Sequence, residues 1–207
     1  MTFALWKKHL PQIFVVLGIA LLLYVGLQYF AMYKEQKRLT QVWERQNSGS
    51  KQHLQQASAE DGLIRLMIPK IDLDAIVVDG AGYKQLKVGP GRITTTPFPG
   101  EPGNAVITAH RDTFFRHIYE LQKGDRITIQ RNGELLSFEV VSKRVVNPED
   151  LSVLKQTSDP QLTLITCYPT YYIGPAPERL VVVTKLVDRQ RASSVAENRA
   201  AAQDAGH

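Results

Sequence analysis

The chain has 207 residues, 43% of them hydrophobic and 22% charged, with a formal net charge of +5. This length allows one ordinary domain plus appendages, and the apolar content is sufficient for a packed core. The excess positive charge lies at the N-terminal end, because residues 1–60 hold seven Lys/Arg and three Asp/Glu whereas residues 61–187 hold fifteen and fourteen. A nearly neutral domain argues against a nucleic-acid-binding face, so we expect no nucleic-acid partner.

Residues 12–31 (QIFVVLGIALLLYVGLQYFA) form an almost continuously apolar run. We expect residues 10–32 to cross a membrane as one helix, which needs about 20 apolar residues. Residues 1–9 end in Lys7, Lys8 and His9, a basic front typical of a signal anchor. No small-x-small cleavage site follows, so we expect the segment to be retained. A buried helix of a soluble domain is disfavoured because the run is apolar on all sides.

Residues 33–61 are polar and predict a stalk and linker. Leu39, Val42 and Trp43 have helical spacing, which indicates that the helix continues beyond the membrane. The sequence NSGS at 47–50 should end it.

Residues 62–187 have the pattern of a β domain, with short apolar, β-branched runs separated by Gly, Pro and Asn. The predicted strands are residues 63–68, 71–78, 104–109, 125–130, 135–146, 162–166 and 180–186. Asn132-Gly133 predicts a hairpin turn between two of them. Short helices fit residues 83–86, 114–121 and 150–154. This punctuation predicts a closed barrel or a sandwich. Residues 188–207 lack an apolar stripe and predict a disordered or weakly helical tail.

Cys167 is the only cysteine in the sequence, which excludes an intrachain disulfide and a multi-thiolate metal site within these residues. It ends a predicted strand, and Arg179 opens the next one. This placement suits a thiolate nucleophile beside a cation. His110 follows another β-branched run and could supply an imidazole. Taken singly, a cysteine or a histidine in such a strand is more often structural than catalytic.

The motifs around these residues resemble those of the sortases, the membrane-anchored cysteine transpeptidases of bacterial surfaces. Residues 163–167 read TLITC, like the sortase motif Thr-Leu-x-Thr-Cys. Residues 103–110 read GNAVITAH, like the sortase histidine segment, and Arg179 opens the strand after the cysteine. The resemblance covers roughly residues 62–186. It implies an eight-stranded β-barrel in which Cys167 is the nucleophile, His110 the acid and base, and Arg179 the group that stabilises the oxyanion or holds the substrate backbone.

Within the family the chain looks most like class D. Residues 167–180 read CYPTYYIGPAPERL, whereas class D sortases typically continue Cys-Tyr-Pro-Phe-Tyr-Tyr-Val-Gly-Ser-Ala-Pro-x-Arg-Phe. Thr170 replaces the usual Phe and Pro175 the usual Ser, which bears on the preferred sorting signal and not on the chemistry. Three further residues are expected to support the site: Asp112 by orienting His110, Thr166 by shaping the site, and Tyr171 by lining a groove.

The resemblance implies cleavage of an LPxT-type sorting signal after its Thr through an acyl-thioester on Cys167. Expected partners are surface proteins with C-terminal LPxTG- or LPxTA-like signals, an amine acceptor from a peptidoglycan cross-bridge or a pilin lysine, and the lipid bilayer. We expect no cofactor and no metal, because Asp72, Asp74 and Asp79 should alternate outward on a strand and not surround calcium.

The expected location is the cell membrane, crossed once, with the catalytic domain extracytoplasmic at the cell surface or in the periplasm. The resemblance places the domain outside. The distribution of Lys and Arg points the other way, since more of them follow the apolar run than precede it.

Two alternative functions stay open. The first is another extracytoplasmic cysteine acyltransferase or peptidase, such as an L,D-transpeptidase, although residues 165–168 (ITCY) do not match its Ser-x-Gly-Cys motif. The second is a non-catalytic, membrane-tethered β-barrel that binds surface proteins. Arg111, Arg116 and His117 are expected to be solvated surface residues.

Overall fold

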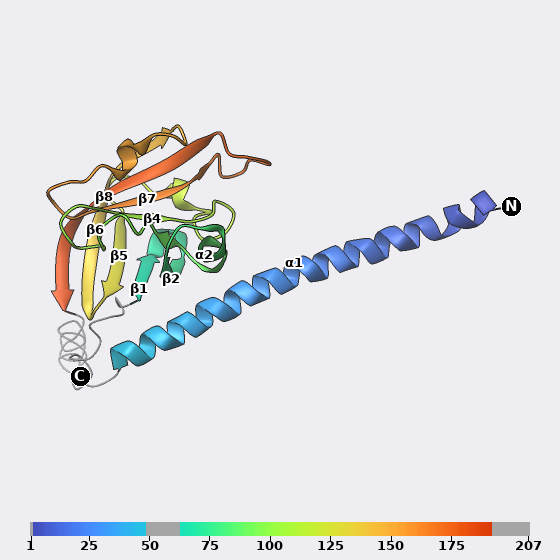
Figure 1. The fold of residues 1–207 in the computed structure, drawn as a ribbon, viewed down its shortest axis with the longest axis horizontal. Helices are drawn as coiled ribbons and strands as arrows, with labels where there is room; N and C mark the ends of the chain where they lie inside the picture. The colour runs from blue at the N-terminus through green and yellow to red at the C-terminus, as the bar shows by residue number, and fades with distance from the viewer. Residues whose placement is uncertain (1, 49–62, 192–207) are drawn as a thin grey trace, which may run out of the picture.

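A long N-terminal helix and a β-barrel make up the part of the chain described by the computed structural model, residues 2–48 and 63–191 (Figure 1). The helix α1 (Thr2–Ser48) is continuous over 47 residues. At a rise of about 1.5 Å per residue it is about 70 Å long. Its stretch Leu10–Glu44 contains a window apolar enough to cross a membrane. The rest of the predicted linker and the predicted tail, residues 49–62 and 192–207, lie outside the described residues.

Eight strands close into a barrel in the order β1-β2-β3-β4-β7-β8-β6-β5, so the predicted eight-stranded barrel is confirmed. The strands are β1 (Ile64–Ile68), β2 (Leu73–Asp79), β3 (Gly91–Arg92), β4 (Asn104–Thr108), β5 (Arg126–Arg131), β6 (Glu134–Val146), β7 (Gln161–Tyr168) and β8 (Glu178–Arg191). The helical elements of the barrel are α2 (Tyr83–Val88), η1 (Pro69–Ile71), η2 (Ile118–Glu120) and η3 (Leu151–Leu154).

Alternating side chains fill the barrel. Every second residue of β1 is buried, and Leu66, Phe138 and Leu164 from three strands are among the fully buried side chains of one core cluster. This is the period-two burial expected of strands that present one face to a core. The hairpin predicted at Asn132-Gly133 is present between β5 and β6, and both residues have the positive φ that a type I′ turn requires.

Two features of the barrel differ from the strands predicted from the sequence. The two-residue strand β3 was not predicted, because Gly91 and Arg92 form no apolar run. The last strand, β8, continues to Arg191, beyond the predicted domain end at residue 187, because β6 pairs with it as far as Arg191 opposite Glu134.

The C-terminal half of α1 packs on the outside of the barrel through Gln36. Its side-chain amide donates to the carbonyls of Ile76 (3.2 Å) and Val88 (2.8 Å), and its oxygen accepts from the N–H of Ile76 (3.1 Å). Gln36 therefore pairs with β2 as a strand residue would. Gly89 makes room for this contact, since a Cβ there would lie 2.5 Å from the Gln36 amide nitrogen.

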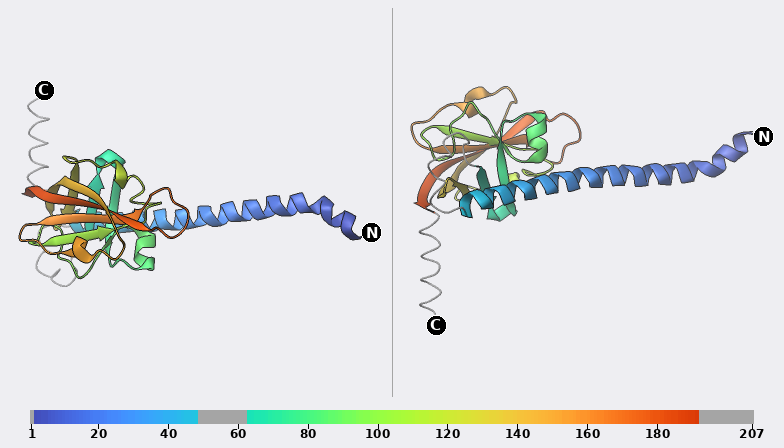
Figure 2. Two further views of the ribbon diagram at one scale, coloured as in Figure 1. Left: turned by 90° about the horizontal axis from the view of Figure 1, so that it is seen from above. Right: turned by 60° about the horizontal axis from the view of Figure 1, so that its bottom comes forward.

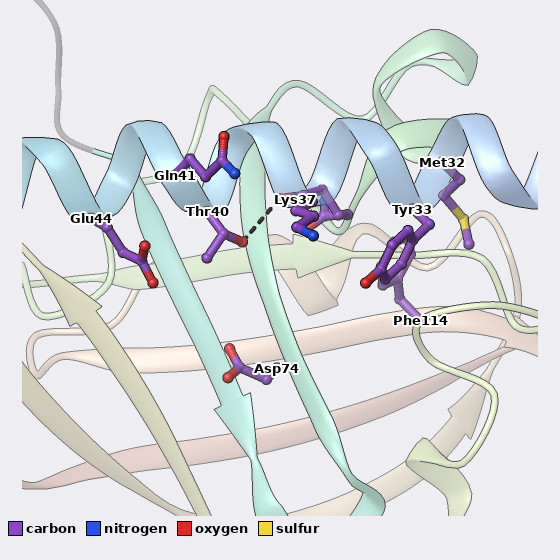
Figure 3. A pocket seen from close by; sticks show the side chains of 9 residues that line it. Met32, Tyr33, Lys37, Thr40, Gln41, Glu44, Asp74 and Phe114 are labelled. Carbon is purple, nitrogen blue, oxygen red and sulfur yellow. Dashed lines mark hydrogen bonds between the residues drawn. The ribbon is translucent and has the colours of Figure 1, made fainter.

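Trp43 makes a second contact between α1 and the barrel. Its side chain is buried, and the Arg65 guanidinium lies 4.9 Å from the centre of its ring. Arg65 in turn forms an ion pair with Asp74 of β2 at 2.7 Å. A cavity of about 490 Å³ remains between α1 and the barrel, where Tyr33 of the helix and Phe114 both line the wall (Figure 3).

Candidate active site

Three neighbouring strands bring the predicted catalytic residues together at one end of the barrel. β4 and β7 are parallel neighbours with Thr108 opposite Ile165, so His110 and Cys167 each stand two residues further along. β7 and β8 are antiparallel neighbours, with Cys167 directly opposite Arg179. Residues 57 positions apart in the sequence therefore reach the same level because β4 and β7 run in the same direction. We refer to this end as the active-site end.

Side-chain hydrogen bonds fix the spacing of the two strands just before His110 and Cys167. The buried Thr166 hydroxyl donates to the carbonyl of Ala109 at 2.8 Å, and the Thr108 hydroxyl donates to the carbonyl of Ile165 at 3.0 Å. The backbone N–H of Ala109 also donates to Ile165, at 3.3 Å. Thr166 thus holds the residue before His110, and its expected part in shaping the site stays a prediction.

The turn after His110 is anchored in the core. The N–H of Phe115 donates to the carbonyl of His110 at 3.1 Å, and the Phe115 side chain is fully buried. His110, Cys167 and Arg179 themselves are partly buried. They are therefore held by a rigid wall and still accessible from solvent, as a nucleophile, a proton carrier and an anion-binding group need to be.

Arg179 contacts the loop that precedes it. Its Nη1 donates to the carbonyls of Glu178 (2.9 Å) and Ala176 (3.3 Å). These bonds hold the guanidinium at the strand end, beside the position of Cys167 in the register. A guanidinium carries five N–H donors, so donors other than those in these two bonds are available to a substrate.

Asp112 lies in the same turn as His110, and both line a cavity of about 350 Å³. The other lining residues come from α1, from α2 and from Thr113. No hydrogen bond joins Asp112 to His110 within the described residues 2–48 and 63–191. The expectation that Asp112 orients His110 therefore stays a prediction.

Arg111 was expected to be a solvated charge, and this expectation was wrong. Its guanidinium donates to the carbonyls of Pro169 (3.0 Å) and Gly174 (2.6 Å), both in the β7–β8 loop (residues 169–177). It also lies 5.8 Å from the centre of the Tyr172 ring. Arg111 therefore ties the turn after His110 to the loop after Cys167. No sequence pattern could reveal this contact, because its acceptors are backbone carbonyls, which every residue has.

Tyr171 holds the same loop at a second point. Its hydroxyl shares a hydrogen bond of 3.0 Å with that of Tyr119, and the two rings meet edge to face with centres 5.8 Å apart. This hydrogen bond raises the pKa of Tyr119 to about 12, so the phenol stays protonated further into the alkaline range than an ordinary tyrosine. Tyr171 itself is exposed, so its predicted place in a substrate groove stays a prediction.

The acidic residues considered for calcium have other partners or positions. Asp74 pairs with Arg65 and Asp79 with Arg92, while Asp72 caps η1 with a positive φ. Across residues 2–48 and 63–191, no group of three or more His, Cys, Asp or Glu side chains is arranged to hold a metal ion. His117 is exposed and hydrogen-bonded to Glu120 at 2.8 Å, as expected of a surface residue.

Comparisons with known proteins agree with this arrangement. The family model described as "Sortase domain" matches residues 66–187. Sortase D of Bacillus subtilis is 30% identical over 196 residues, which cover 87% of this chain and 99% of that protein. Among solved structures, a sortase D5 transpeptidase of Clostridium perfringens has a TM-score of 0.67 at 26% identity, covering 75% of this chain and 99% of its own.

A class C relative is also similar. Sortase C-3 of Streptococcus pneumoniae has a TM-score of 0.60 at 26% identity, and the match covers 79% of this chain and 87% of that one. The family match extends over more than half of the chain, and Sortase D matches nearly its whole length. The chain belongs to the sortase family of transpeptidases, and within that family it is most like class D.

Proposed function

We propose that the protein is a membrane-anchored cysteine transpeptidase that cleaves an LPxT-type sorting signal after its Thr and transfers the acyl group to an amine. The observation that carries this proposal is the register of β4, β7 and β8, in which His110, Cys167 and Arg179 end at one level of the wall. A thiol, an imidazole and a guanidinium are the three groups that cysteine-dependent acyl transfer requires.

The proposed reaction has two halves. The Cys167 thiolate attacks the Thr carbonyl carbon, the peptide C–N bond breaks, and the His110 imidazolium gives its proton to the departing amine. In the second half His110 takes a proton from the incoming amine, which attacks the thioester and releases Cys167. Arg179 donates to the oxyanion formed in each half, and its planar, permanently charged fork suits this role.

The β7–β8 loop is proposed to bear on the choice of sorting signal. It joins the nucleophile to Arg179, and it holds the two departures from the class D pattern, Thr170 and Pro175. Candidate substrates are surface proteins that end in LPxTG- or LPxTA-like signals. Candidate acceptors are a peptidoglycan cross-bridge amine and a pilin lysine.

The apolar part of α1 is proposed to anchor the enzyme as a single membrane span. Residues 10–32, within the apolar stretch Leu10–Glu44, supply the span. The barrel then lies on the extracytoplasmic side. This side is argued from membership of the sortase family, whose members are surface enzymes.

The test uses the full chain in detergent with LPxTG and LPxTA peptides and a separate amine acceptor. Intact-mass spectrometry should detect an acyl adduct on Cys167 and a transpeptidated product, and Cys167→Ala should lose both. If no peptide forms an adduct and Cys167 of the folded protein is also unreactive toward a small thiol reagent, the enzyme proposal fails in favour of a binding module. A reactive Cys167 without turnover would reject only the proposed substrate class.

A further inference from the structure

The active-site end of the barrel faces the membrane-spanning part of α1. In all views the β7–β8 loop and α2 extend from the barrel in the direction of the N-terminus (Figures 1 and 2). The cavity beside His110 and Asp112 is also lined by Gln28, Tyr29 and Met32 of α1. These three residues stand where the apolar run ends. The turn that carries His110 therefore lies level with the end of the run.

The barrel is held in this position by the continuous helix. α1 passes without interruption from the apolar run to Gln36 and Trp43, which attach it to β2 and to Arg65. A helix that both spans a bilayer and is fixed to a domain sets the height of that domain above the bilayer. The same geometry decides which face of the barrel is turned toward the lipid.

The side chains that protrude at this end are aromatic and apolar. At the tip of the β7–β8 loop, Ile173 is 100% exposed, Tyr171 67% and Tyr172 48%, and Tyr83 at the start of α2 is 76% exposed. Tyrosines are enriched where proteins meet the membrane–water interface, because the ring enters the apolar layer while the hydroxyl stays hydrated. A fully exposed isoleucine costs free energy in water and gains it in lipid.

Lysines lie on the α1 and α2 side of this end, where the carboxylates of Asp112 and Glu178 are also exposed. Lys84 and Lys87 are exposed on α2 beside Tyr83, and Lys34 follows the apolar run of α1 with its ammonium group 5.8 Å from the Phe30 ring centre. Lysines next to interfacial aromatic residues attract anionic lipid headgroups. The apolar tip, the tyrosines and the lysines together match a bilayer surface, and two of these residues, Tyr83 and Lys87, also line the cavity beside His110.

Hydrogen bonds within the protein hold the β7–β8 loop in place without any lipid contact. Arg111 binds two of its carbonyls, and Tyr119 binds the Tyr171 hydroxyl. A preformed contact loses less conformational entropy on binding than a flexible one. It also means that lipid contact acts on the segment between Cys167 and Arg179.

We propose that the tip of the β7–β8 loop, together with the first turn of α2, rests in the interfacial layer of an anionic bilayer, so that acyl transfer takes place at the membrane surface. This inference rests on the proposed anchoring of α1 in the bilayer. The loop tip would lie at a depth of roughly 5–10 Å, as other interfacial segments do.

The test places an environment-sensitive fluorophore at the tip. The full chain carrying Cys167→Ala and Ile173→Cys is labelled with the dye NBD and reconstituted into vesicles of phosphatidylcholine and phosphatidylglycerol. The matched control carries Cys167→Ala and Asn132→Cys in the exposed β5–β6 turn. This turn is at the other end, since the nearby Gln130 pairs with Arg65, which stacks on Trp43. A blue-shifted emission that brominated lipids quench is expected at position 173 and not at position 132.

Three outcomes would overturn the inference. In the first, the chain still floats with the vesicles after alkaline carbonate extraction, but the NBD emission at position 173 is not shifted. This result would support the membrane anchor and reject the lipid contact of the loop tip. A blue shift without quenching by brominated lipid would show that protein and not lipid covers the tip. A chain that carbonate extracts from the vesicles would reject the anchor, and the lipid contact with it.

Discussion

At the residue scale, two buried threonines make the same hydrogen bond at two places in the barrel wall. The hydroxyl of Thr166 donates to Ala109, beside His110, while that of Thr184 donates to Leu162 at 2.8 Å, away from the active-site end. Both side chains are almost completely buried. Substituting each threonine in turn therefore shows whether the hydrogen bond beside His110 affects activity as well as stability.

Thr166→Val and Thr184→Val should each lower the free energy of unfolding by about 1–3 kcal/mol, because each leaves a buried carbonyl without its donor. Only Thr166→Val should also lower kcat/KM, since it loosens Ala109, the residue before His110. Urea unfolding and peptide turnover measure the two effects. An equal loss of activity in both variants would show that the Thr166 bond contributes stability alone.

Arg111 offers a prediction about geometry as opposed to charge. Arg111→Ala should lower kcat/KM by roughly 10- to 100-fold, because the loop after Cys167 loses two of its fixed points and small misplacements are costly in catalysis. Arg111→Lys should not restore the activity, since an ammonium cannot make the same forked contact.

The control for Arg111 is Arg116→Ala, which removes an exposed guanidinium from the same turn and should leave turnover unchanged. Steady-state assays of the three variants with one peptide are sufficient. A fully active lysine variant would show that only the positive charge at position 111 matters.

Sequence motifs predicted the three residues that we propose carry the chemistry, because the order of His110, Cys167 and Arg179 along the chain follows the pattern of the family. The residues that position them were harder to predict. Arg111 acts on backbone carbonyls 58 and 63 residues later in the chain. Which carbonyls it reaches depends on how two loops meet in space, and that meeting follows from the closed barrel and not from any local pattern.

At the element scale, α1 depends on Gln36 for its attachment to the barrel. Gln36→Ala removes three hydrogen bonds and leaves both polar groups of Ile76 without their partner on the helix. We expect the C-terminal part of α1 to detach from the barrel more readily, because the free energy that holds it there falls by about 1–3 kcal/mol. The indole of Trp43, now buried, would then meet water.

Tryptophan fluorescence of the full chain in detergent measures this detachment. With Trp6→Phe as background, Trp43 is the only tryptophan, and Gln36→Ala should shift its emission to longer wavelength. Gln41→Ala removes an exposed glutamine of the same helix that lines the cavity beside the barrel; it is the matched control and should leave the emission in place. An unchanged spectrum for Gln36→Ala would mean that Trp43 alone keeps α1 in position.

The sequence predicted seven of the strands and the β5–β6 hairpin, because these elements carry local signals of apolar alternation and turn residues. It could not predict β3, which exists only because Gly91 and Arg92 lie between β2 and β4 and complete their hydrogen bonds. The packing of α1 against the barrel could not be predicted either, since Gln36 is one glutamine among several in a polar stretch.

At the scale of the whole molecule, the barrel is unevenly paired. β6 and β8 pair over twelve positions, whereas β2 and β3 pair over two. The backbone amides of Val78 and Gly80 donate to the carbonyls of Pro90 and Arg92, across the short β2–β3 pairing. These amide hydrogens should therefore exchange with solvent faster than those of Val181 and Val182 in β8.

Hydrogen exchange followed by mass spectrometry or NMR tests this order. The expected result is early exchange along β2 and β3 and late exchange along β7 and β8, which carry Cys167 and Arg179. Uniform protection around the barrel would contradict it. The expected order implies that local opening of the barrel leaves the spacing of Cys167 and Arg179 intact.

The presence of a single sulfhydryl has a consequence for how the enzyme responds to oxidants. A sulfenic acid formed on Cys167 finds no second cysteine within these 207 residues with which to form an internal disulfide. Under the proposed mechanism, restoring activity therefore depends on a reductant from outside these 207 residues, and further oxidation of the sulfur to a sulfinic or sulfonic acid is irreversible. Wherever this sortase works, the redox chemistry of its surroundings limits its working life.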